Sequence, residues 1–135
     1  MTPLLQVRRL TARHGPIVAV REVGLTVNEG EIVALLGANG AGKTSTLGAI
    51  AGVVTRDGEI RLDGVDISRL RPEQIVRRGV SLTPEGRRVF TGLTVAENLA
   101  LGAARRRDGA KPRRERLLEL FPVLGRRLNA PAGTL

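Results

Sequence analysis

The chain has 135 residues, 41% of them hydrophobic, which is enough to bury the core of one domain. It contains no cysteine and a single histidine, so disulfides, thiolate nucleophiles and histidine-rich metal sites are excluded. Gln6, Arg8 and Arg9 stand where a signal peptide needs an apolar run, and no apolar stretch approaches the ~18 residues that span a membrane. We expect a soluble chain with an aliphatic core, attached to a membrane only through a partner if at all.

The net charge of +9 raises the question of a nucleic-acid partner, because all but two of the 22 basic residues are arginine. Residues 105–116 concentrate seven basic and two acidic side chains. A nucleic-acid patch and a solvated helix face both fit this pattern. The segment carries no aromatic platform for base stacking, so we favour the solvated face.

Apolar patterns predict the strands. Apolar and polar residues alternate over residues 4–11, 17–20 and 23–27, which predicts strands there. Residues 31–36, E-I-V-A-L-L, form a continuous apolar run that is typical of a strand buried on both faces of a parallel sheet. Further strands are predicted over 58–62, 65–67 and 80–83.

Helices are predicted over residues 43–51, 72–79, 95–104 and 113–120. Pro72 suits the first position of its helix, and Thr94 to Glu97 form a capping-box pattern before the third. In the last helix an apolar stripe is expected to pack, formed by Leu117, Leu118, Leu120 and Phe121. Residues 129–135 are expected to be irregular.

The most informative motif, G-A-N-G-A-G-K-T, occupies residues 37–44, directly after the apolar run. It fits G-x-x-x-x-G-K-[ST], the pattern of a loop that binds nucleotide phosphates. Gly40 and Gly42 allow the backbone to curl so that its N–H groups point at an anion. Lys43 adds a positive charge, the Thr44 hydroxyl can ligate Mg²⁺, and the following helix directs its positive end at the phosphates. We therefore predict a nucleoside triphosphate site.

Other interpretations of the same glycines are weaker. The spacing G-x-x-G-x-G places Ser45 where the third glycine of a dinucleotide-binding fingerprint belongs. A GTPase would share the loop, but the sequence contains no Asn-Lys-x-Asp motif for guanine. A glycine-rich turn without a ligand remains the plainest alternative.

Taken in order, the motifs resemble those of ABC transporter ATPases. Residues 37–45 resemble the phosphate loop of that family, residues 61–67 its β-hairpin segment, and L-T-V-A-E-N-L at 93–99 the opening of its helical subdomain. P-E-G-R-R-V-F at 84–90 resembles the ATP-binding subunits of branched-chain amino acid importers. The resemblance implies an α/β fold: an incomplete phosphate-loop ATPase core with an N-terminal antiparallel β segment (1–84) and a partial helical subdomain (85–135).

The resemblance also implies a function, which is ATP binding with Mg²⁺ in the energy-coupling subunit of an importer for branched-chain amino acids. His14 stands where the family places an aromatic ring on adenine, and Glu85 where most members carry a glutamine that senses the γ-phosphate. The implied metal ligands are Thr44 and Glu85. The nucleotide would contact His14, Glu85 and the loop residues Gly37, Asn39, Gly40, Ala41, Gly42, Lys43, Thr44 and Ser45.

Members of the family work with transmembrane permease subunits and a second ATP-binding subunit. The resemblance therefore implies a cytoplasmic location, peripheral on the inner face of the cell membrane, with residues 87–90 facing the permease. The family's signature, Walker B aspartate, catalytic glutamate and switch histidine follow a Gly-Thr-Leu like that at 133–135, and this sequence does not contain them. We expect a truncated form that binds ATP without hydrolysing it alone. The alternatives are a non-functional remnant and a basic nucleic-acid-binding fragment.

Overall fold

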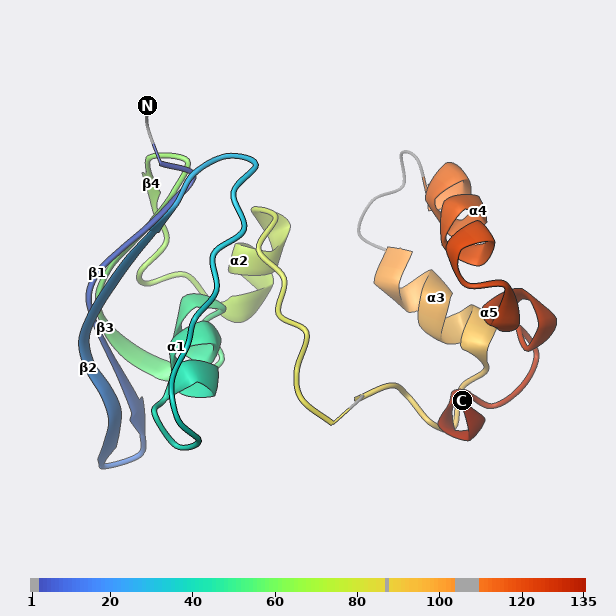
Figure 1. Cartoon of the computed structure of the whole chain (residues 1–135), viewed down its shortest axis with the longest axis horizontal. Coiled ribbons are helices and arrows are strands. Elements are labelled where there is room, and N and C mark those ends of the chain that lie inside the picture. Colours follow the sequence, from blue (N-terminus) through green and yellow to red (C-terminus); the bar gives the residue numbers. More distant parts are fainter. Residues whose placement is uncertain (1–2, 87, 104–109) are drawn as a thin grey trace. The chain divides into compact units, whose positions relative to one another are not determined.

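The computed structural model of the chain describes residues 3–86, 88–103 and 110–135. They fall into two compact units, Met1–Thr83 and Pro84–Leu135 (Figure 1). Strands and helices make up the first unit, and the described part of the second unit is helical. Among the described residues no helix has the length and apolar character needed to cross a bilayer.

The strands of the first unit form one antiparallel sheet, in the order β2-β1-β3-β4. They are β1 (Leu5–His14), β2 (Ile17–Val27), β3 (Thr55–Leu62) and β4 (Val65–Asp66). Strands β1 and β2 are joined by a two-residue turn that pairs His14 with Ile17, which is the short connection that antiparallel neighbours favour. The two strands predicted over 17–20 and 23–27 are thus one continuous strand.

A register shift in β1 explains why its buried side chains do not alternate strictly. Val7, Leu10 and Ala12 are all buried, although the first two are three positions apart. The pairing of β1 with both neighbours shifts between these residues, and Arg9 has a φ of 49° there. A bulge of this kind returns the apolar side chains to one face of the sheet.

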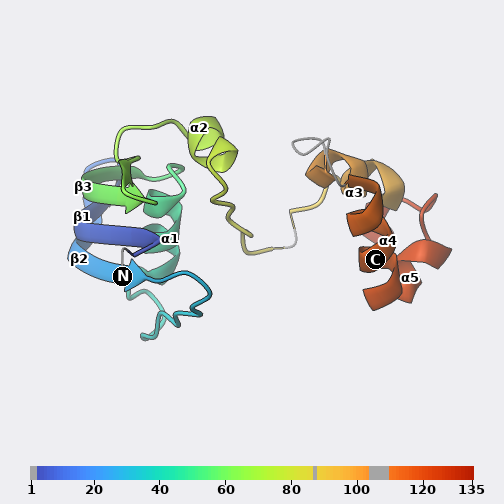
Figure 2. The ribbon, with the colours of Figure 1, turned by 90° about the horizontal axis from the view of Figure 1, so that it is seen from above.

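The core of the first unit lies where helix α1 (Lys43–Ile50) crosses one face of the sheet (Figure 2). Helix α2 (Pro72–Arg77) contributes Ile75. As the composition predicts, the core is aliphatic. Its buried members are Val7, Leu10, Ala12, Ala49, Ile50, Ile60, Ile67 and Ile75.

The second unit consists of α3 (Val95–Ala103), α4 (Ala110–Leu120), α5 (Pro122–Arg126) and the 3₁₀ helix η1 (Ala132–Thr134). The N–H groups of Val95 and Ala96 donate to the carbonyls of Ala130 and Leu128, at 3.0 and 2.9 Å. These bonds join the start of α3 to the C-terminal segment. In the predicted stripe of α4, Leu117 and Leu118 are half-buried, whereas Leu120 and Phe121 are exposed.

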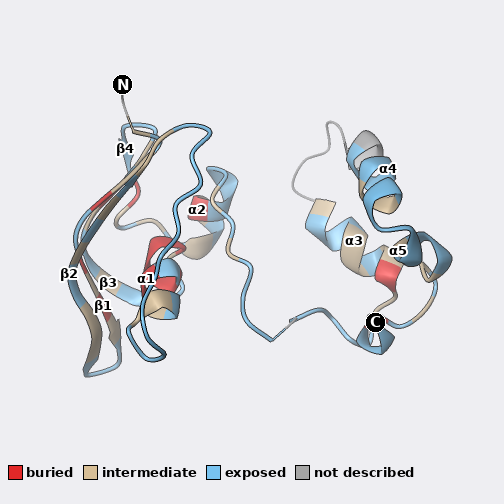
Figure 3. Ribbon diagram, in the orientation of Figure 1, coloured by how far each residue is buried: buried red, intermediate tan, exposed pale blue. Residues whose placement is uncertain are grey.

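Two predicted strands are wrong. Residues 31–36 and 80–83 form no regular structure, and the segment predicted to be buried on both faces is exposed throughout, with Ile32 at 97% (Figure 3). The physical reason is that a strand exists only as part of a ladder. The sheet described above is antiparallel, and no described strand pairs with either segment.

Candidate functional site

The phosphate loop lies between the exposed segment 31–36 and helix α1. Two backbone positions with positive φ shape it: Gly40 at 83° and Gly42 at 87°. A turn hydrogen bond from Ala41 N to Ala38 O, 3.1 Å long, closes the tip. Residues 37–41 are exposed, and Gly42 and Lys43 are half-buried. The predicted curl therefore forms even though the segment before it is not a strand.

Helix α1 presents an N-terminus suited to an anion. Gly42 is its N-cap and makes no side-chain capping bond, and the first turn contains no acidic residue. The first N–H groups of a helix have no partner within the helix, and its N-terminus carries a partial positive charge. A phosphate group would supply the acceptors and the negative charge that the sequence of this turn does not.

Lys43 places a positive charge over the loop. Its Nζ donates to the carbonyl oxygens of Gly37 and Ala38, at 2.7 and 2.8 Å. The side chain thus folds back along the loop instead of extending from the helix. An ammonium group has three protons that can rotate, so from this position it can donate a hydrogen bond to an anion bound in the loop.

The loop is fixed to the sheet at Gly42. A Cβ atom at this position would lie 2.4 Å from Val20 Cγ1 and 2.9 Å from Ala19 O, both in β2. On the helix side, the hydroxyl of buried Thr46 donates to the carbonyl oxygen of Gly42 at 2.9 Å. Close packing on one side and a hydrogen bond on the other hold the end of the loop in place.

His14 and Ser45 come together at the same end of α1. His14 Nε2 and Ser45 Oγ share a hydrogen bond of 2.9 Å, whose donor depends on the imidazole tautomer. His14 is the last residue of β1 and is exposed, while Ser45 is half-buried in the first turn of α1. The resemblance assigned both residues to the nucleotide separately, and their contact could not be predicted from positions 31 residues apart.

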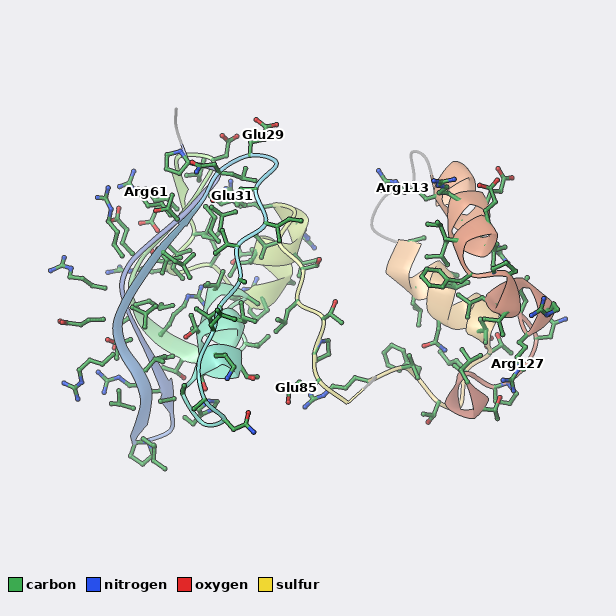
Figure 4. The ribbon with its side chains drawn as sticks, viewed as in Figure 1. Glu29, Glu31, Arg61, Glu85, Arg113 and Arg127 are labelled. Carbon is green, nitrogen blue, oxygen red and sulfur yellow. The ribbon has the colours of Figure 1, made fainter. Side chains whose placement is uncertain are left out.

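The two predicted metal ligands belong to different units. Thr44 is an exposed residue in the first turn of α1, and a hydroxyl oxygen is a suitable ligand for Mg²⁺. Glu85 is an exposed residue of the second unit, in the segment before α3 (Figure 4), and its role toward the phosphates stays a prediction. The described residues contain no group of three or more acidic or histidine side chains placed to hold a metal. Substrate phosphates commonly supply the remaining oxygens to Mg²⁺.

The described residues whose pKa is shifted lie outside the phosphate loop. Burial lowers the pKa of Arg56, whose guanidinium donates to the carbonyls of Ser68 and Leu70 at 2.9 and 2.8 Å. These groups line a cleft of about 350 Å³ formed by residues 52–56 and 68–70, beyond the C-terminal end of α1. The negative end of a helix disfavours phosphate. The cleft is therefore a poorer nucleotide site than the loop.

The arginine-rich segment is described in part. Residues 104–109, and Arg87 in the predicted permease-facing surface, lie outside the described residues. In α4, Arg113, Arg114 and Arg116 are exposed, and Arg116 pairs with Glu119 at 3.3 Å. Figure 4 labels Arg113 at the start of this helix. Exposed arginines of this kind fit both the solvated face and the nucleic-acid patch, so the preference for the solvated face stays a prediction.

The chain is similar to known proteins in both sequence and fold. The ABC transporter family model matches residues 20–132. The chain is 40% identical over 134 residues to the high-affinity branched-chain amino acid transport ATP-binding protein BraG of Pseudomonas aeruginosa, covering 98% of this chain and 58% of BraG. It is 38% identical over 125 residues to the ribose import ATP-binding protein RbsA of Yersinia pestis, covering 92% of this chain and 25% of RbsA.

A solved structure of an ATP-binding subunit of an ABC transporter superposes with a TM-score of 0.78 at 33% identity, covering 93% of this chain and 53% of the other. The fold is thus an α/β phosphate-loop ATPase core, of which the chain contains a part with an N-terminal antiparallel β segment. The chain belongs to the ABC transporter family. It spans 58% of the length of BraG and a quarter of RbsA.

Proposed function

We propose that the chain binds Mg-ATP through residues 37–45, as part of the ATP-binding subunit of an importer. The observation that carries the proposal is the loop itself: two glycines at positive φ lead into a helix whose first turn has neither a side-chain cap nor an acid. Lys43 is already folded over this loop. An anion with several oxygens fits all three features at once.

Each remaining site residue takes the role that the family resemblance gives it. The loop residues Gly37, Asn39, Gly40, Ala41 and Ser45 contribute to the phosphate cradle. Thr44 ligates Mg²⁺, and His14 contacts adenine. Glu85 is proposed to sense the γ-phosphate and to share the metal. When bound, the metal supplies positive charge at the β- and γ-phosphates.

The proposed transport substrate is a branched-chain amino acid. Support comes from the 40% identity to BraG and from P-E-G-R-R-V-F at 84–90. The similarity to RbsA, a ribose import protein by name, indicates that the loop does not by itself distinguish substrates. We propose that permease subunits select the transport substrate and that a second ATP-binding subunit completes the assembly. We also propose that the chain is cytoplasmic and reaches the inner face of the membrane through the permease.

The test is titration of the purified chain with Mg-ATP by calorimetry, compared with Lys43→Ala. A hydrogen bond to a charged group contributes about 1.5–3 kcal/mol, so we expect the substitution to weaken binding by about 10- to 150-fold. Lys111→Ala is the matched control, because Lys111 is the other lysine of the chain. It removes the same charge outside the loop and should leave the affinity within about twofold.

Four outcomes would contradict the proposal. Absence of Mg-ATP binding by a chain that unfolds cooperatively would exclude a nucleotide site. Equal loss in both lysine variants would indicate a general charge effect. DNA binding that weakens steeply with salt, in a chain that ignores Mg-ATP, would favour the nucleic-acid alternative. A chain without a cooperative transition would match the remnant alternative.

A further inference from the structure

Arginine and apolar side chains occur together on the exposed surface of α4 and α5. In α4, Arg113, Arg116 and Leu120 stand at positions i, i+3 and i+7, which places them on one face of the helix. In α5, Val123 and Arg126 are three positions apart and share a face in the same way. We call this surface the α4–α5 corner, and its members are Arg113, Arg116, Leu120, Phe121, Val123 and Arg126. All of them are exposed (Figure 3).

The apolar members of the corner leave much of their surface in water. Leu120, Phe121 and Val123 are 58, 54 and 45% exposed. Single exposed apolar side chains are ordinary on a protein surface, but here three occur within four positions. Because contact of apolar surface with water is unfavourable, these side chains would gain free energy by entering another apolar layer.

The arginines give the same surface a positive charge. Arg116 pairs with Glu119 at 3.3 Å, whereas Arg113 and Arg126 form no ion pair with any described residue. Glu115, the other acid of α4, lies roughly 130° around the helix axis from the centre of the arginine face. A guanidinium group stays charged at physiological pH, and its planar donors match the oxygens of a phosphate. The corner therefore combines phosphate-binding groups with apolar side chains.

We propose that the α4–α5 corner docks on the headgroup layer of a bilayer that contains anionic phospholipid. The arginines bind lipid phosphates, and the apolar side chains enter the boundary beneath them, as in helices that lie at a membrane interface. A nucleic acid offers phosphates but no apolar layer for Leu120 and Val123. A second copy of the chain offers apolar surface, but a symmetric contact would bring arginine against arginine.

The inference goes beyond the proposed function, in which the permease alone brings the chain to the membrane. The corner adds a direct contact with lipid that requires neither nucleotide nor permease. A contact of a few charges and three apolar side chains is weak and reversible. Its contribution in the assembly is to raise the effective concentration of the chain at the membrane surface, where the permease lies.

The test is cosedimentation of the full chain with vesicles of phosphatidylcholine, alone or mixed equally with phosphatidylglycerol. We expect binding to the mixed vesicles only. An arginine at an anionic surface contributes about fivefold in affinity, so Arg113→Gln combined with Arg116→Gln should weaken binding about 25-fold. The matched control combines Arg21→Gln with Arg78→Gln, which removes the same charge from exposed positions of the first unit. It should leave binding within about twofold.

The apolar part of the corner is tested by Leu120→Gln. Glutamine has nearly the helix propensity of leucine, so the substitution changes polarity and preserves the helix. Burial of half a leucine side chain corresponds to about fivefold in affinity, which is the loss that we expect. Leu101→Gln is the control, because Leu101 in α3 is 51% exposed and lies outside the corner. If circular dichroism shows that Leu120→Gln melts early, Val123→Gln replaces it with the same expected direction.

Several results would overturn the inference. Equal binding to both kinds of vesicle, or equal weakening by the two arginine pairs, would exclude specific docking of the corner. Full binding by both Leu120→Gln and Val123→Gln would mean that no apolar side chain enters the bilayer. An oligonucleotide that binds in place of vesicles would favour the nucleic-acid patch, and a dimer dispersed by Leu120→Gln would favour a second copy. Mg-ATP titration of the same variants should be unchanged, so failure here leaves the proposed function intact.

Discussion

Replacement of Gly42 by alanine should destabilise the first unit strongly. Gly42 has φ 87° and ψ 12°, a left-handed conformation that costs an L-residue about 1–2 kcal/mol. The added Cβ would also lie 2.4 Å from Val20 Cγ1 and 2.9 Å from Ala19 O. Because that carbonyl belongs to a paired strand, it cannot move without disturbing the sheet, and overpacking of this kind costs about 1–3 kcal/mol. We expect a total loss of about 2–5 kcal/mol.

Gly40→Ala is the matched control. Gly40 has φ 83°, nearly the same strain, but a Cβ there would meet no described atom within 4 Å. Its expected loss is the conformational cost alone, about 1–2 kcal/mol. The difference between the two variants therefore isolates the contact of the loop with β2.

The assay is urea unfolding of both variants without nucleotide, followed by circular dichroism. With a slope of about 2 kcal/mol per molar urea, a loss of about 3 kcal/mol moves the midpoint down by about 1.5 M. Sucrose, which strengthens burial, keeps the transition measurable if a variant is largely unfolded in buffer. Equal midpoints for the two variants would refute the argument, because the contact with β2 would then carry no energy.

Two further predictions address the hydrophobic core and the loss of stability at acid pH. Leu10→Ala removes a fully buried side chain and should lower the free energy of unfolding by about 2–5 kcal/mol. Ile32 is 97% exposed, so Ile32→Ala should change it by less than about 0.5 kcal/mol. A large loss in Ile32→Ala would instead favour the buried strand that the sequence predicts. Hydrogen bonds from the backbone N–H and hydroxyl of Thr94 lower the pKa of Glu97. A lowered folded-state pKa stabilises the fold above the ordinary pKa of glutamate, and this stability is lost as the pH falls through the folded-state value. Urea midpoints measured from pH 7 to pH 3 should therefore fall less steeply in Glu97→Gln, and an unchanged slope would contradict this role.

Local signals were sufficient to predict α1, α2 and α3, whereas the start of α4 and the short helices α5 and η1 were missed. The capping box of Thr94 and Glu97 forms as its pattern predicts, with mutual bonds of 3.2 and 2.8 Å between the two residues. Pro72 begins α2, and α1 begins at the lysine of the loop. Each of these features depends on residues within about one helical turn, so no knowledge of distant segments was needed.

The two wrongly predicted strands and the unpredicted contact between His14 and Ser45 depend instead on residues far apart in the sequence. Residues 31–36 have the apolar pattern of a buried strand, but whether a strand forms is decided by a partner elsewhere in the sheet. The contact between His14 and Ser45 likewise depends on how β1 meets α1. The local sequence shows an apolar segment and the two polar residues. It does not show which distant segment the apolar run would pair with, or that His14 and Ser45 meet.

This contrast separates the two ends of the proposed nucleotide site. The phosphate end is built from neighbours in sequence: two glycines at positive φ, the carbonyls of Gly37 and Ala38 that hold Lys43, and the first turn of α1. It therefore forms even though residues 31–36 are unpaired. The base end needs β1 and α1 to meet correctly, since His14 reaches the loop through Ser45. Perturbing the sheet while α1 persists should accordingly weaken recognition of the base before recognition of the phosphates, and comparing ATP with tripolyphosphate, which carries the phosphates without sugar or base, measures that order.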